Sequence, residues 1–422
     1  MSGPPTDANG NNRPAGQPTT TVIVGAGIMG SCLANILATR GHSVVLIDRS
    51  VRGLPGSTGH APGYVGQFNA IPALTTLAVR SVERYVTIPK AFNRVGGLEV
   101  ALTDTEQEKL EKRCAEAKLE GMSATLVDAA IAHAKAPFFV VESKVKGALW
   151  FENDGTADGP LIALYEQQQA QAKGAKLVDA DVVSVEQGRV ILSHGLGTVE
   201  ADNVVVCAGI WTTSLLAGLS VVPVAHPYAY TQEREARQLR TPFVRYPETH
   251  IYVRDHGLKD GVGCYAHDPI AVAQSEITNS AYGAWHSSFE QALTDSLSVL
   301  PTETRDTFDN SPQTAGKDRV FNGLFSVTPD ALPLVGKVKQ GSNVYVATAA
   351  WVTHAAGCAL LAADIIDDTV HTKDDWLVSQ LDPHRFDGRE SGELQSQALS
   401  TYNDIYNKEL ATASDSAGLV VH

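Results

Sequence analysis

A glycine-rich loop near the start of the chain has the spacing of a site that binds the pyrophosphate of a dinucleotide. Gly25, Gly27 and Gly30 lie between an apolar segment at 21–24 and a segment of helical spacing at 31–40. Glycine at these positions permits a tight turn, lets the backbone approach the phosphates and lets the helix pack closely on the strand. The amino terminus of that helix would offer N–H groups and the positive end of its dipole to the phosphates.

An acidic residue completes this pattern. A second apolar segment at 44–47 ends at Asp48, about 20 residues after the loop, where a carboxylate can accept hydrogen bonds from ribose hydroxyls. The order of strand, glycine loop, helix, strand and acid predicts a nucleotide-binding βαβ unit. The alternative is a tight turn on a doubly wound sheet that binds no ligand.

A histidine follows this unit in an irregular loop. His60 lies in the segment 55–63, which reads PGSTGHAPG. A histidine in such a loop is ordinarily a structural hydrogen-bonding residue. The glycines and prolines could instead hold a neutral imidazole against a flavin, so that a ring nitrogen attacks the C8 methyl carbon. The spacing alone does not choose between these two roles.

The composition excludes several classes of partner. The chain has 422 residues, a formal net charge of −14 and 43% hydrophobic residues, so two interwoven domains are expected. A chain this acidic is not expected to bind nucleic acid or an anionic membrane, which favours a small-molecule substrate. No apolar run reaches the roughly 20 residues that span a bilayer. The histidines show no metal-ligand spacing, so no metal site is expected.

The termini and the cysteines favour a cytoplasmic location. Residues 1–20 are rich in Pro, Gly, Asn and Thr and are predicted to be a disordered tail. They lack the features of a signal or transit peptide, and the chain does not end in a peroxisomal motif. The five cysteines are scattered and odd in number, which indicates free thiols in a reducing compartment.

The strand pattern predicts two interleaved domains. Apolar segments at 204–209 and 344–347 can return to the N-terminal sheet, whereas the region between them alternates short strands with aromatic-rich turns. An interrupted nucleotide domain of this kind favours a flavoprotein. We expect an α/β fold in which a Rossmann-like FAD-binding domain is interleaved with an antiparallel-sheet substrate-binding domain. The expected boundaries are 21–90, 146–222 and 322–375 for the first domain, 91–145 and 223–321 for the second, and 376–422 for a polar C-terminal tail on the surface.

Five ordered segments carry a resemblance to a known family. They are GSTGHAPG at 56–63, VGGLEVA at 95–101, GCYAH at 263–267, FNGLFSVTPD at 321–330 and WVTHAAG at 351–357. Through them the chain resembles, from about Thr21 to about Tyr406, the flavin half of dimethylglycine oxidase, dimethylglycine dehydrogenase and sarcosine dehydrogenase, in the D-amino-acid-oxidase superfamily. The resemblance implies the fold of that superfamily and FAD as cofactor.

The resemblance also implies which residues hold FAD. In the family, the histidine of the Ser-Thr-x-His motif carries FAD covalently through its 8α position, and the matching residue is His60. The run 350–353 would lie by the pyrimidine end of the flavin, where the dipole of the following helix stabilises negative charge. The further cofactor contacts that we expect are Ile28, Met29, Asp48, Arg49, Ser57, Thr58, Tyr64, Val182, Ala208, Gly209, Ala350, Trp351, Val352 and Thr353.

The resemblance implies a catalytic pair, His226 and Tyr252. Hydride can leave the carbon beside an amine only when the nitrogen lone pair is free, so a histidine could take a proton from the amine or hold it. A tyrosine hydroxyl could orient the histidine or the substrate. Without the resemblance, His226 is a strand-end hydrogen-bonding residue and Tyr252 a cross-strand aromatic. A substrate carboxylate could meet any of four arginines, among which the sequence does not choose: Arg80, Arg84, Arg245 and Arg254.

Three departures from the family concern the substrate. The chain stops at residue 422, so no tetrahydrofolate-binding domain is expected in it. Pro227 follows the expected catalytic histidine where relatives commonly have glutamine, and it stiffens the turn. Tyr64 stands where a smaller aliphatic residue is usual, and Val253 where a second tyrosine can occur. These differences leave the identity of the amine open.

We therefore expect FAD-dependent oxidation of a C–N bond in a secondary or tertiary amine, with an N-methyl group as the expected target. Hydride would go to flavin N5, and the electrons would pass to oxygen or to an electron-transfer partner. The iminium would be hydrolysed with release of formaldehyde, or trapped within the same molecule in a biosynthetic ring closure. The alternatives are oxidation of a hydroxy acid or another C–O substrate, and a flavin-binding protein without turnover.

Overall fold

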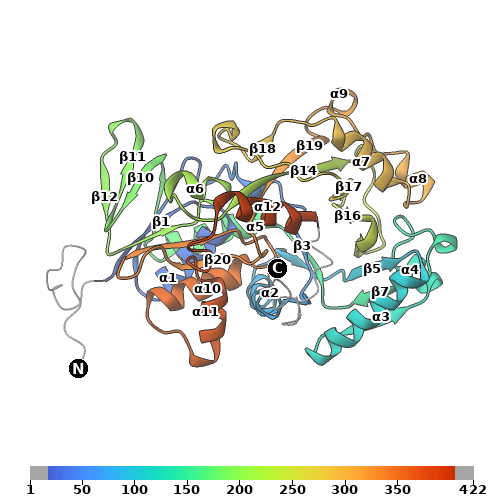
Figure 1. The fold of residues 1–422 in the computed structure, drawn as a ribbon, viewed down its shortest axis with the longest axis horizontal. Helices are drawn as coiled ribbons and strands as arrows, with labels where there is room; N and C mark the ends of the chain where they lie inside the picture. The colour runs from blue at the N-terminus through green and yellow to red at the C-terminus, as the bar shows by residue number, and fades with distance from the viewer. Residues whose placement is uncertain (1–17, 404–422) are drawn as a thin grey trace, which may run out of the picture.

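Two large sheets occupy different halves of the molecule (Figure 1). The computed structural model describes residues 18–403. The first sheet has six strands in the order β20-β21-β13-β1-β2-β9, and its neighbours are parallel except for β20 and β21. Its strands are β1 (Thr20–Val24), β2 (Ser43–Asp48), β9 (Lys176–Asp179), β13 (Asn203–Val206), β20 (Leu334–Lys337) and β21 (Val344–Thr348).

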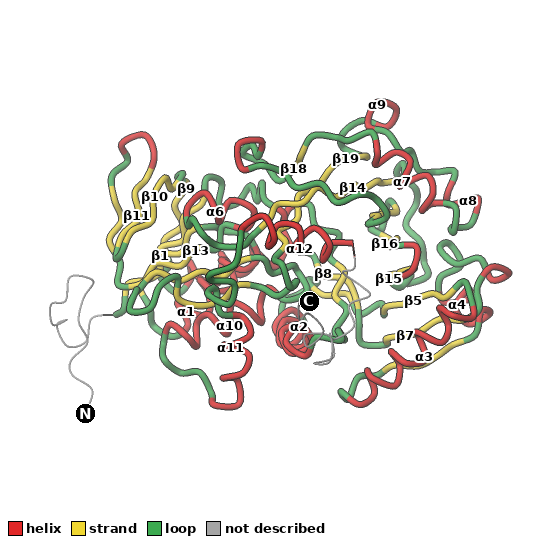
Figure 2. Tube along the Cα trace, in the orientation of Figure 1, coloured by secondary structure: helices red, strands yellow, loops and turns green. Residues whose placement is uncertain are grey.

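Both faces of this sheet are covered, as its apolar strands require. Successive side chains of a strand point to opposite faces. Ile23 of β1 therefore packs into a core shared with α1 (Ile28–Thr39), α5 (Gly159–Ala172) and α10 (Ala355–Ile366). Val22 packs on the other face with residues of a small sheet formed by β10 (Val182–Glu186), β11 (Arg189–Leu192) and β12 (Thr198–Glu200). Figure 2 shows helices gathered along the side of the sheet that carries α1 and α10.

Some helices begin at a side-chain cap, whereas others, such as α1 and α10, have none. The side chain of Thr103 accepts a hydrogen bond from the N–H of Glu106 at the start of α3, and Asp158 accepts one from Leu161 at the start of α5. The remaining helices are α2 (Pro72–Tyr85), α3 (Asp104–Leu119), α4 (Ala129–Lys135), α6 (Thr212–Leu215), α7 (Ser288–Leu297), α8 (Thr302–Arg305), α9 (Pro312–Ala315), α11 (Asp375–Leu381) and α12 (Ser391–Asn403).

The second large sheet has nine strands in the order β18-β19-β14-β17-β16-β15-β5-β7-β6. Its neighbours are antiparallel except for β15 and β5, which run parallel. The strands are β5 (Gly97–Ala101), β6 (Ala124–Val127), β7 (Gly147–Phe151), β14 (Val222–Tyr230), β15 (Phe243–Tyr246), β16 (Ile251–Asp255), β17 (Asp260–Cys264), β18 (Tyr282–Gly283) and β19 (Val320–Val327). Smaller sheets contain β3 (Tyr64–Val65), β4 (Phe92–Asn93) and β8 (Gly155–Ala157), and β10 (Val182–Glu186), β11 (Arg189–Leu192) and β12 (Thr198–Glu200).

The strand pairing corrects two of the expected domain boundaries. Strand β7 pairs with β5 and β6, and β19 pairs with β14 and β18. Both strands therefore belong to the nine-stranded sheet, although the sequence pattern placed 146–222 and most of 320–327 in the FAD-binding domain. An apolar strand looks alike in either sheet, and only its partners assign it.

The segment after Trp376 is more than a polar surface tail. Helix α12 buries Leu394, Ala398 and Tyr402, and it crosses the middle of the molecule in Figure 1. Of the expected N-terminal tail, residues 1–17 lie outside the described residues, and Thr20 already begins β1. Within residues 18–403, no helix is long and apolar enough to cross a membrane, and no cluster of His, Cys, Asp and Glu could hold a metal ion.

Candidate active site

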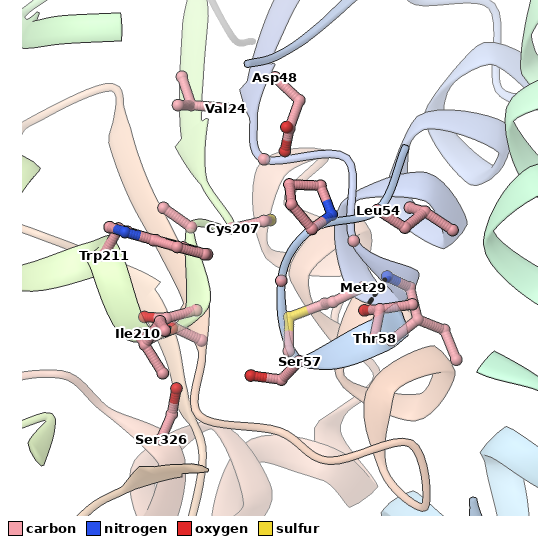
Figure 3. Close-up of a pocket in the computed structure, with 18 of the residues that line it drawn as sticks. Val24, Met29, Asp48, Leu54, Ser57, Thr58, Cys207, Ile210, Trp211 and Ser326 are labelled. Atoms are coloured by element: carbon pink, nitrogen blue, oxygen red, sulfur yellow. Dashed lines mark hydrogen bonds between the residues drawn. The ribbon is translucent and has the colours of Figure 1, made fainter. Parts of the chain in front are cut away.

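The first of two adjoining cavities lies at the carboxyl ends of the parallel strands, where open α/β sheets bind their ligands. Its lining includes the residue that directly follows each of four parallel strands: Gly25, Arg49, Cys207 and Ala349. Figure 3 shows Asp48, Met29 and Ser57 around the same space. The cavity thus joins segments that are far apart in the chain.

Two backbone N–H groups hold Asp48 in place. Its Oδ2 accepts a hydrogen bond from the N–H of Ala26 at 2.8 Å, and its Oδ1 accepts one from Ser50 at 2.9 Å. A carboxylate has about four acceptor positions. Asp48 therefore keeps acceptor capacity for hydroxyl groups of a ligand in the cavity.

The loop that carries Ser57 and Thr58 is attached to the start of α1. Oγ1 of Thr58 accepts a hydrogen bond from the N–H of Ile28 at 3.0 Å, and Oγ of Ser57 donates one to the carbonyl of Leu324 at 2.9 Å. Gly27 precedes the helix, and a Cβ at this position would lie 3.0 Å from Oγ1 of Thr58. The close approach of loop and helix depends on the missing side chain.

Most residues predicted to contact the cofactor line the first cavity: Gly25, Gly27, Ile28, Met29, Asp48, Arg49, Ser57, Thr58, Val182, Ala208, Gly209, Ala350, Trp351 and Val352. Tyr64 and Thr353 line the second cavity instead. Gly30 lines neither, and a Cβ there would overlap the carbonyl oxygen of Gly25. Glycine at this position allows α1 to pack against the loop.

The side chain of His60 also lines neither cavity. Its Nε2 lies 3.2 Å from the carbonyl oxygen of Pro55, and its ring lies 3.8 Å from that of Tyr282, measured between centroids. A carbonyl only accepts, so Nε2 carries the proton and the lone pair is on Nδ1. Burial lowers the pKa of His60, which favours the neutral imidazole. The neighbouring Ala61 lines both cavities.

The second cavity adjoins the first. The two share Ala61, Phe325, Trp351 and Val352 in their linings. The second cavity is further lined by Tyr252 of the nine-stranded sheet and by the loop before α10. The shared residues mark the place where a bound cofactor would meet a substrate.

His226 on β14 and Tyr252 on β16 are brought together across β17. Tyr252 Oη lies 2.7 Å from Nε2 of His226, and the tyrosine ring crosses Gly263 of β17, where a Cβ would overlap it. Of the two, Tyr252 lines the second cavity and His226 lies behind it. Burial, and secondarily His267, lowers the pKa of His226 well below its usual value. His226 is therefore a neutral imidazole, with one ring nitrogen that donates and one that accepts a hydrogen bond.

Tyr402 is a site residue that sequence reasoning missed. Its Oη lies 2.6 Å from Nδ1 of His226 and 2.9 Å from Nε2 of His267. It reaches them from α12, in the segment expected to be a tail. The four-residue spacing of Leu394, Ala398 and Tyr402 indicates the buried face of a helix and could have identified the segment as packed structure.

An arginine cluster consists of Glu99, Arg113, Arg245, Asp154 and Tyr64, of which sequence reasoning named Arg245 and Tyr64 and missed the other three. Arg113 Nε lies 2.8 Å from Glu99, which also pairs with Arg245, and Tyr64 donates to Asp154 Oδ2 at 3.0 Å. Burial raises the pKa of Glu99, but the two arginines outweigh this and lower it. Burial raises the pKa of Asp154 to about 7.

The structure separates the four arginines that could meet a substrate carboxylate. Arg245 lines the second cavity. Arg80 and Arg84 form ion pairs elsewhere in the fold, and Arg254 donates to a backbone carbonyl. Arg113, which the sequence did not single out, lines the second cavity beside Arg245.

A family model described as FAD dependent oxidoreductase (DAO) matches residues 20–365, which include most of both large sheets. The chain belongs to this family of FAD-dependent oxidoreductases. The predicted family and the predicted enzyme class are thereby confirmed.

This FAD-dependent oxidoreductase is similar to several curated proteins. Mitochondrial dimethylglycine dehydrogenase of Mus musculus is 25% identical over 407 residues, which cover 89% of this chain and 46% of the relative. 4-Methylaminobutanoate oxidase (formaldehyde-forming) of Paenarthrobacter nicotinovorans is 25% identical over 345 residues, with 78% and 40% covered. Mitochondrial sarcosine dehydrogenase of Homo sapiens is 25% identical over 360 residues, with 79% and 38% covered. The chain thus spans less than half the length of these relatives.

Solved structures share the fold of this oxidoreductase. L-Proline dehydrogenase from P. horikoshii superposes with a TM-score of 0.74 at 20% identity, covering 90% of this chain and 99% of that one. Glycine oxidase from Geobacillus kaustophilus gives 0.70 at 19% identity, covering 87% and 99%. The predicted α/β fold of the D-amino-acid-oxidase type is confirmed.

The first cavity of the oxidoreductase suits FAD. The start of α1 opens onto it with no acidic side chain in the first helical turn, so no negative charge on that turn opposes a pyrophosphate. Asp48 offers acceptor positions to ribose hydroxyls, and Gly27 leaves the helix start uncovered. These residues would hold the nucleotide, and the shared residues between the cavities would lie beside the flavin.

Proposed function

We propose that the chain oxidises a C–N bond of a secondary or tertiary amine that carries a carboxylate, with an N-methyl group as the reacting one. The observation that carries this proposal is the wall of the second cavity. There Tyr252 lines the cavity, and its hydroxyl lies 2.7 Å from Nε2 of the neutral His226 behind the cavity wall. An amine must lose its proton before the neighbouring carbon gives up hydride. The neutral imidazole behind Tyr252 offers a lone pair for that proton, and burial makes it a weaker base than a free histidine.

Bound FAD would supply the two-electron acceptor for the amine. The residues of the chain perform the remaining tasks. Tyr252 contacts the amine, and His226 takes up its proton through Tyr252. Trp351 and Phe325 line both cavities, so they exclude water from the place where the amine and the cofactor meet.

The arginine cluster supports a carboxylate on the substrate. Arg113 and Arg245 carry two positive charges against one negative charge on Glu99. Asp154 adds little charge below pH 7 because burial raises its pKa to about 7. His354 in the same cavity is uncharged, since burial lowers its pKa to about 3. Among the described residues of the cluster, this surplus of positive charge favours a carboxylate over a second amine.

The fate of the oxidised substrate is part of the proposal. Hydrolysis of an N-methyl iminium releases formaldehyde and the shorter amine, and the name of the formaldehyde-forming 4-methylaminobutanoate oxidase supports this outcome. Capture of the iminium by a nucleophile of the same molecule would instead close a ring. Oxygen or an electron-transfer partner would then reoxidise the cofactor.

The proposal is tested by anaerobic mixing of the holoenzyme with single compounds while flavin absorbance is followed. We expect sarcosine, dimethylglycine or 4-methylaminobutanoate to bleach the flavin, with formaldehyde formed after one turnover. Bleaching by lactate or glycerol phosphate, but by no amine, would show oxidation at C–O bonds instead. Absence of bleaching by every compound would support a flavin-binding protein without turnover.

Arg245→Met tests the carboxylate. We expect the KM of a carboxylate-bearing amine to rise about tenfold or more, the range for loss of a charged hydrogen-bonding partner. The KM of N-methylpropylamine, which lacks the carboxylate, should stay unchanged. Arg80→Met is the matched control, because Arg80 pairs with Asp374 and lines neither described cavity. Equal effects on both amines would contradict carboxylate recognition by Arg245.

A further inference from the structure

Four side chains form a continuous series of hydrogen bonds behind the second cavity. Tyr252 Oη lies 2.7 Å from Nε2 of His226, whose Nδ1 lies 2.6 Å from Tyr402 Oη. Tyr402 Oη lies 2.9 Å from Nε2 of His267, whose Nδ1 lies 2.8 Å from the backbone carbonyl of Asp268. We call this series the relay. It begins at the cavity with Tyr252 and ends at a backbone carbonyl.

The carbonyl at its end determines the direction of every bond in the relay. A carbonyl oxygen only accepts, so Nδ1 of His267 carries the proton. Burial lowers the pKa of His267, so the ring is neutral and its Nε2 accepts the single hydroxyl proton of Tyr402. Nδ1 of His226 must then donate to Tyr402 Oη.

The same reasoning continues to the cavity. His226 is neutral, since burial and His267 lower its pKa, and a neutral ring whose Nδ1 donates has its lone pair on Nε2. Tyr252 therefore donates its hydroxyl proton to His226. Because its own proton is donated to His226, the Tyr252 hydroxyl oxygen can accept a proton but has none to donate to an amine.

We propose that Tyr402 and His267 are positioning residues, which hold His226 in its Nδ1–H tautomer and so make Tyr252 a one-way proton acceptor for the amine. This inference rests on the proposed function for the identity of the proton donor. Neither Tyr402 nor His267 lines the described cavities. Both act through His226.

Proton transfer along the relay moves one proton across each of its hydrogen bonds and conserves atoms and charge. The ammonium N–H of the substrate gives its proton to Tyr252, and the hydroxyl proton of Tyr252 passes to Nε2 of His226. The Nδ1 proton of His226 passes to Tyr402, and the hydroxyl proton of Tyr402 passes to Nε2 of His267. The substrate becomes a neutral amine and His267 becomes the imidazolium. Burial opposes that charge, whereas the Asp268 carbonyl, which still accepts from Nδ1–H, and the Asp268 carboxylate favour it.

Helix α12 is anchored so that Tyr402 reaches this position. Thr401 donates a hydrogen bond to the carbonyl of Pro329 at 2.7 Å. The side-chain amide of Asn403 donates to the carbonyls of Tyr265 and His267, both at 2.9 Å. The residues on either side of Tyr402 thus tie the end of the helix to the loop that carries His267, and Tyr402 itself is fully buried.

The direct test is the tautomer of His226 in holoenzyme labelled with 15N-histidine. Long-range 1H–15N correlations distinguish the two neutral tautomers, and loss of signals in His226→Asn assigns the residue. We expect Nδ1–H in the wild type. His267→Leu removes the acceptor of the Tyr402 proton, so Tyr402 should donate to His226 and switch it to Nε2–H. An Nε2–H tautomer in the wild type overturns the proposal.

Flavin reduction by an amine provides the second readout. We expect Tyr402→Phe and His267→Leu to slow reduction about tenfold or more, within the range for proton transfer by positioned groups. His267→Gln retains an acceptor oxygen for Tyr402 and should restore most of the rate. Tyr246→Phe is the control, because this buried tyrosine donates to Phe139 and lies outside both cavities.

The two hypotheses fail in different ways. If no amine reduces the flavin while His226 shows the expected tautomer and the switch in His267→Leu, the proposed function fails and the direction of the relay stands. If amines reduce the flavin but His267→Leu changes neither the tautomer nor the rate, the relay is refuted and the proposed function stands.

Discussion

Tyr64, which lines the same cavity as Arg245, donates a hydrogen bond to Asp154 at 3.0 Å. Burial raises the pKa of this carboxyl to about 7, and the N–H of Gln67 and the Tyr64 hydroxyl oppose the shift only in part. The charge of the arginine cluster therefore changes near neutral pH. Below pH 7, Asp154 is protonated and the five described residues of the cluster carry a surplus of one positive charge. Above pH 7, the Asp154 carboxylate cancels that charge.

The affinity for a carboxylate should accordingly fall as the pH rises through about 7. Acetate is a suitable probe because its own charge is constant above pH 6. If the Asp154 charge changes the free energy of acetate binding by ~1 kcal/mol, the Kd of acetate rises roughly fivefold between pH 6 and 8. This Kd is measured from the flavin spectrum of the holoenzyme. Asp154→Asn should bind acetate with the same Kd at both values. A pH dependence that persists in this variant would contradict the assignment to Asp154.

Gly27→Ala should weaken FAD binding. The added Cβ would lie 3.0 Å from Oγ1 of Thr58, which is bonded to the first N–H of α1, so the loop or the helix start must shift. We expect the purified variant to contain less flavin and its apoprotein to bind FAD about tenfold more weakly, which titration of flavin fluorescence would measure. Gly392→Ala, where a Cβ meets nothing within 4 Å, should bind FAD as the wild type does.

The proposed covalent link through His60 predicts that flavin stays with the protein after acid precipitation. The wild-type pellet should be yellow, and His60→Ala should release its flavin into the supernatant. His194→Ala, at an exposed histidine, is the control and should keep a yellow pellet. In the structure the His60 ring faces Pro55 and Tyr282, so attachment requires its rotation toward the cavity. A colourless wild-type pellet with free FAD in solution would refute the link.

Arg84→Met should destabilise the fold without acting on the site. Glu166 is buried and accepts hydrogen bonds from Arg84 at 2.6 Å and from Asn35 at 2.5 Å. Loss of the arginine leaves a buried carboxylate without its cation, which costs about 3 kcal/mol of unfolding free energy. Arg40→Met removes two more exposed pairs, with Asp364 and Asp367, and should cost about 1 kcal/mol or less. Denaturant unfolding of both variants measures the difference; equal losses would contradict this account.

The nucleotide-binding half of the site was readable from the sequence because its determinants are local. The strand, the glycines and the first turn of α1 are consecutive in the chain, and their spacing reflects the geometry of one turn. Asp48 lies at the end of the next strand. The returning strands β13 and β21 were predicted for the same reason, because each is a continuous apolar run in the chain.

The catalytic pair was identified through the resemblance and not from its own spacing. His226 and Tyr252 meet because β14, β17 and β16 are adjacent and Gly263 leaves room for the tyrosine ring. Strand order is set by packing across the whole sheet, so a sequence pattern confined to one strand does not reveal it.

What the sequence by itself determined is the FAD-binding βαβ unit, since each of its parts interacts with its neighbours in the chain. Only the tertiary structure decided the partners of His226 and the charge of the second cavity. Tyr402 comes from 176 residues away, and Arg245 and Glu99 are 146 residues apart. Burial then shifts the pKa values of His226 and Asp154, and burial is a property of the packed fold that no residue carries alone.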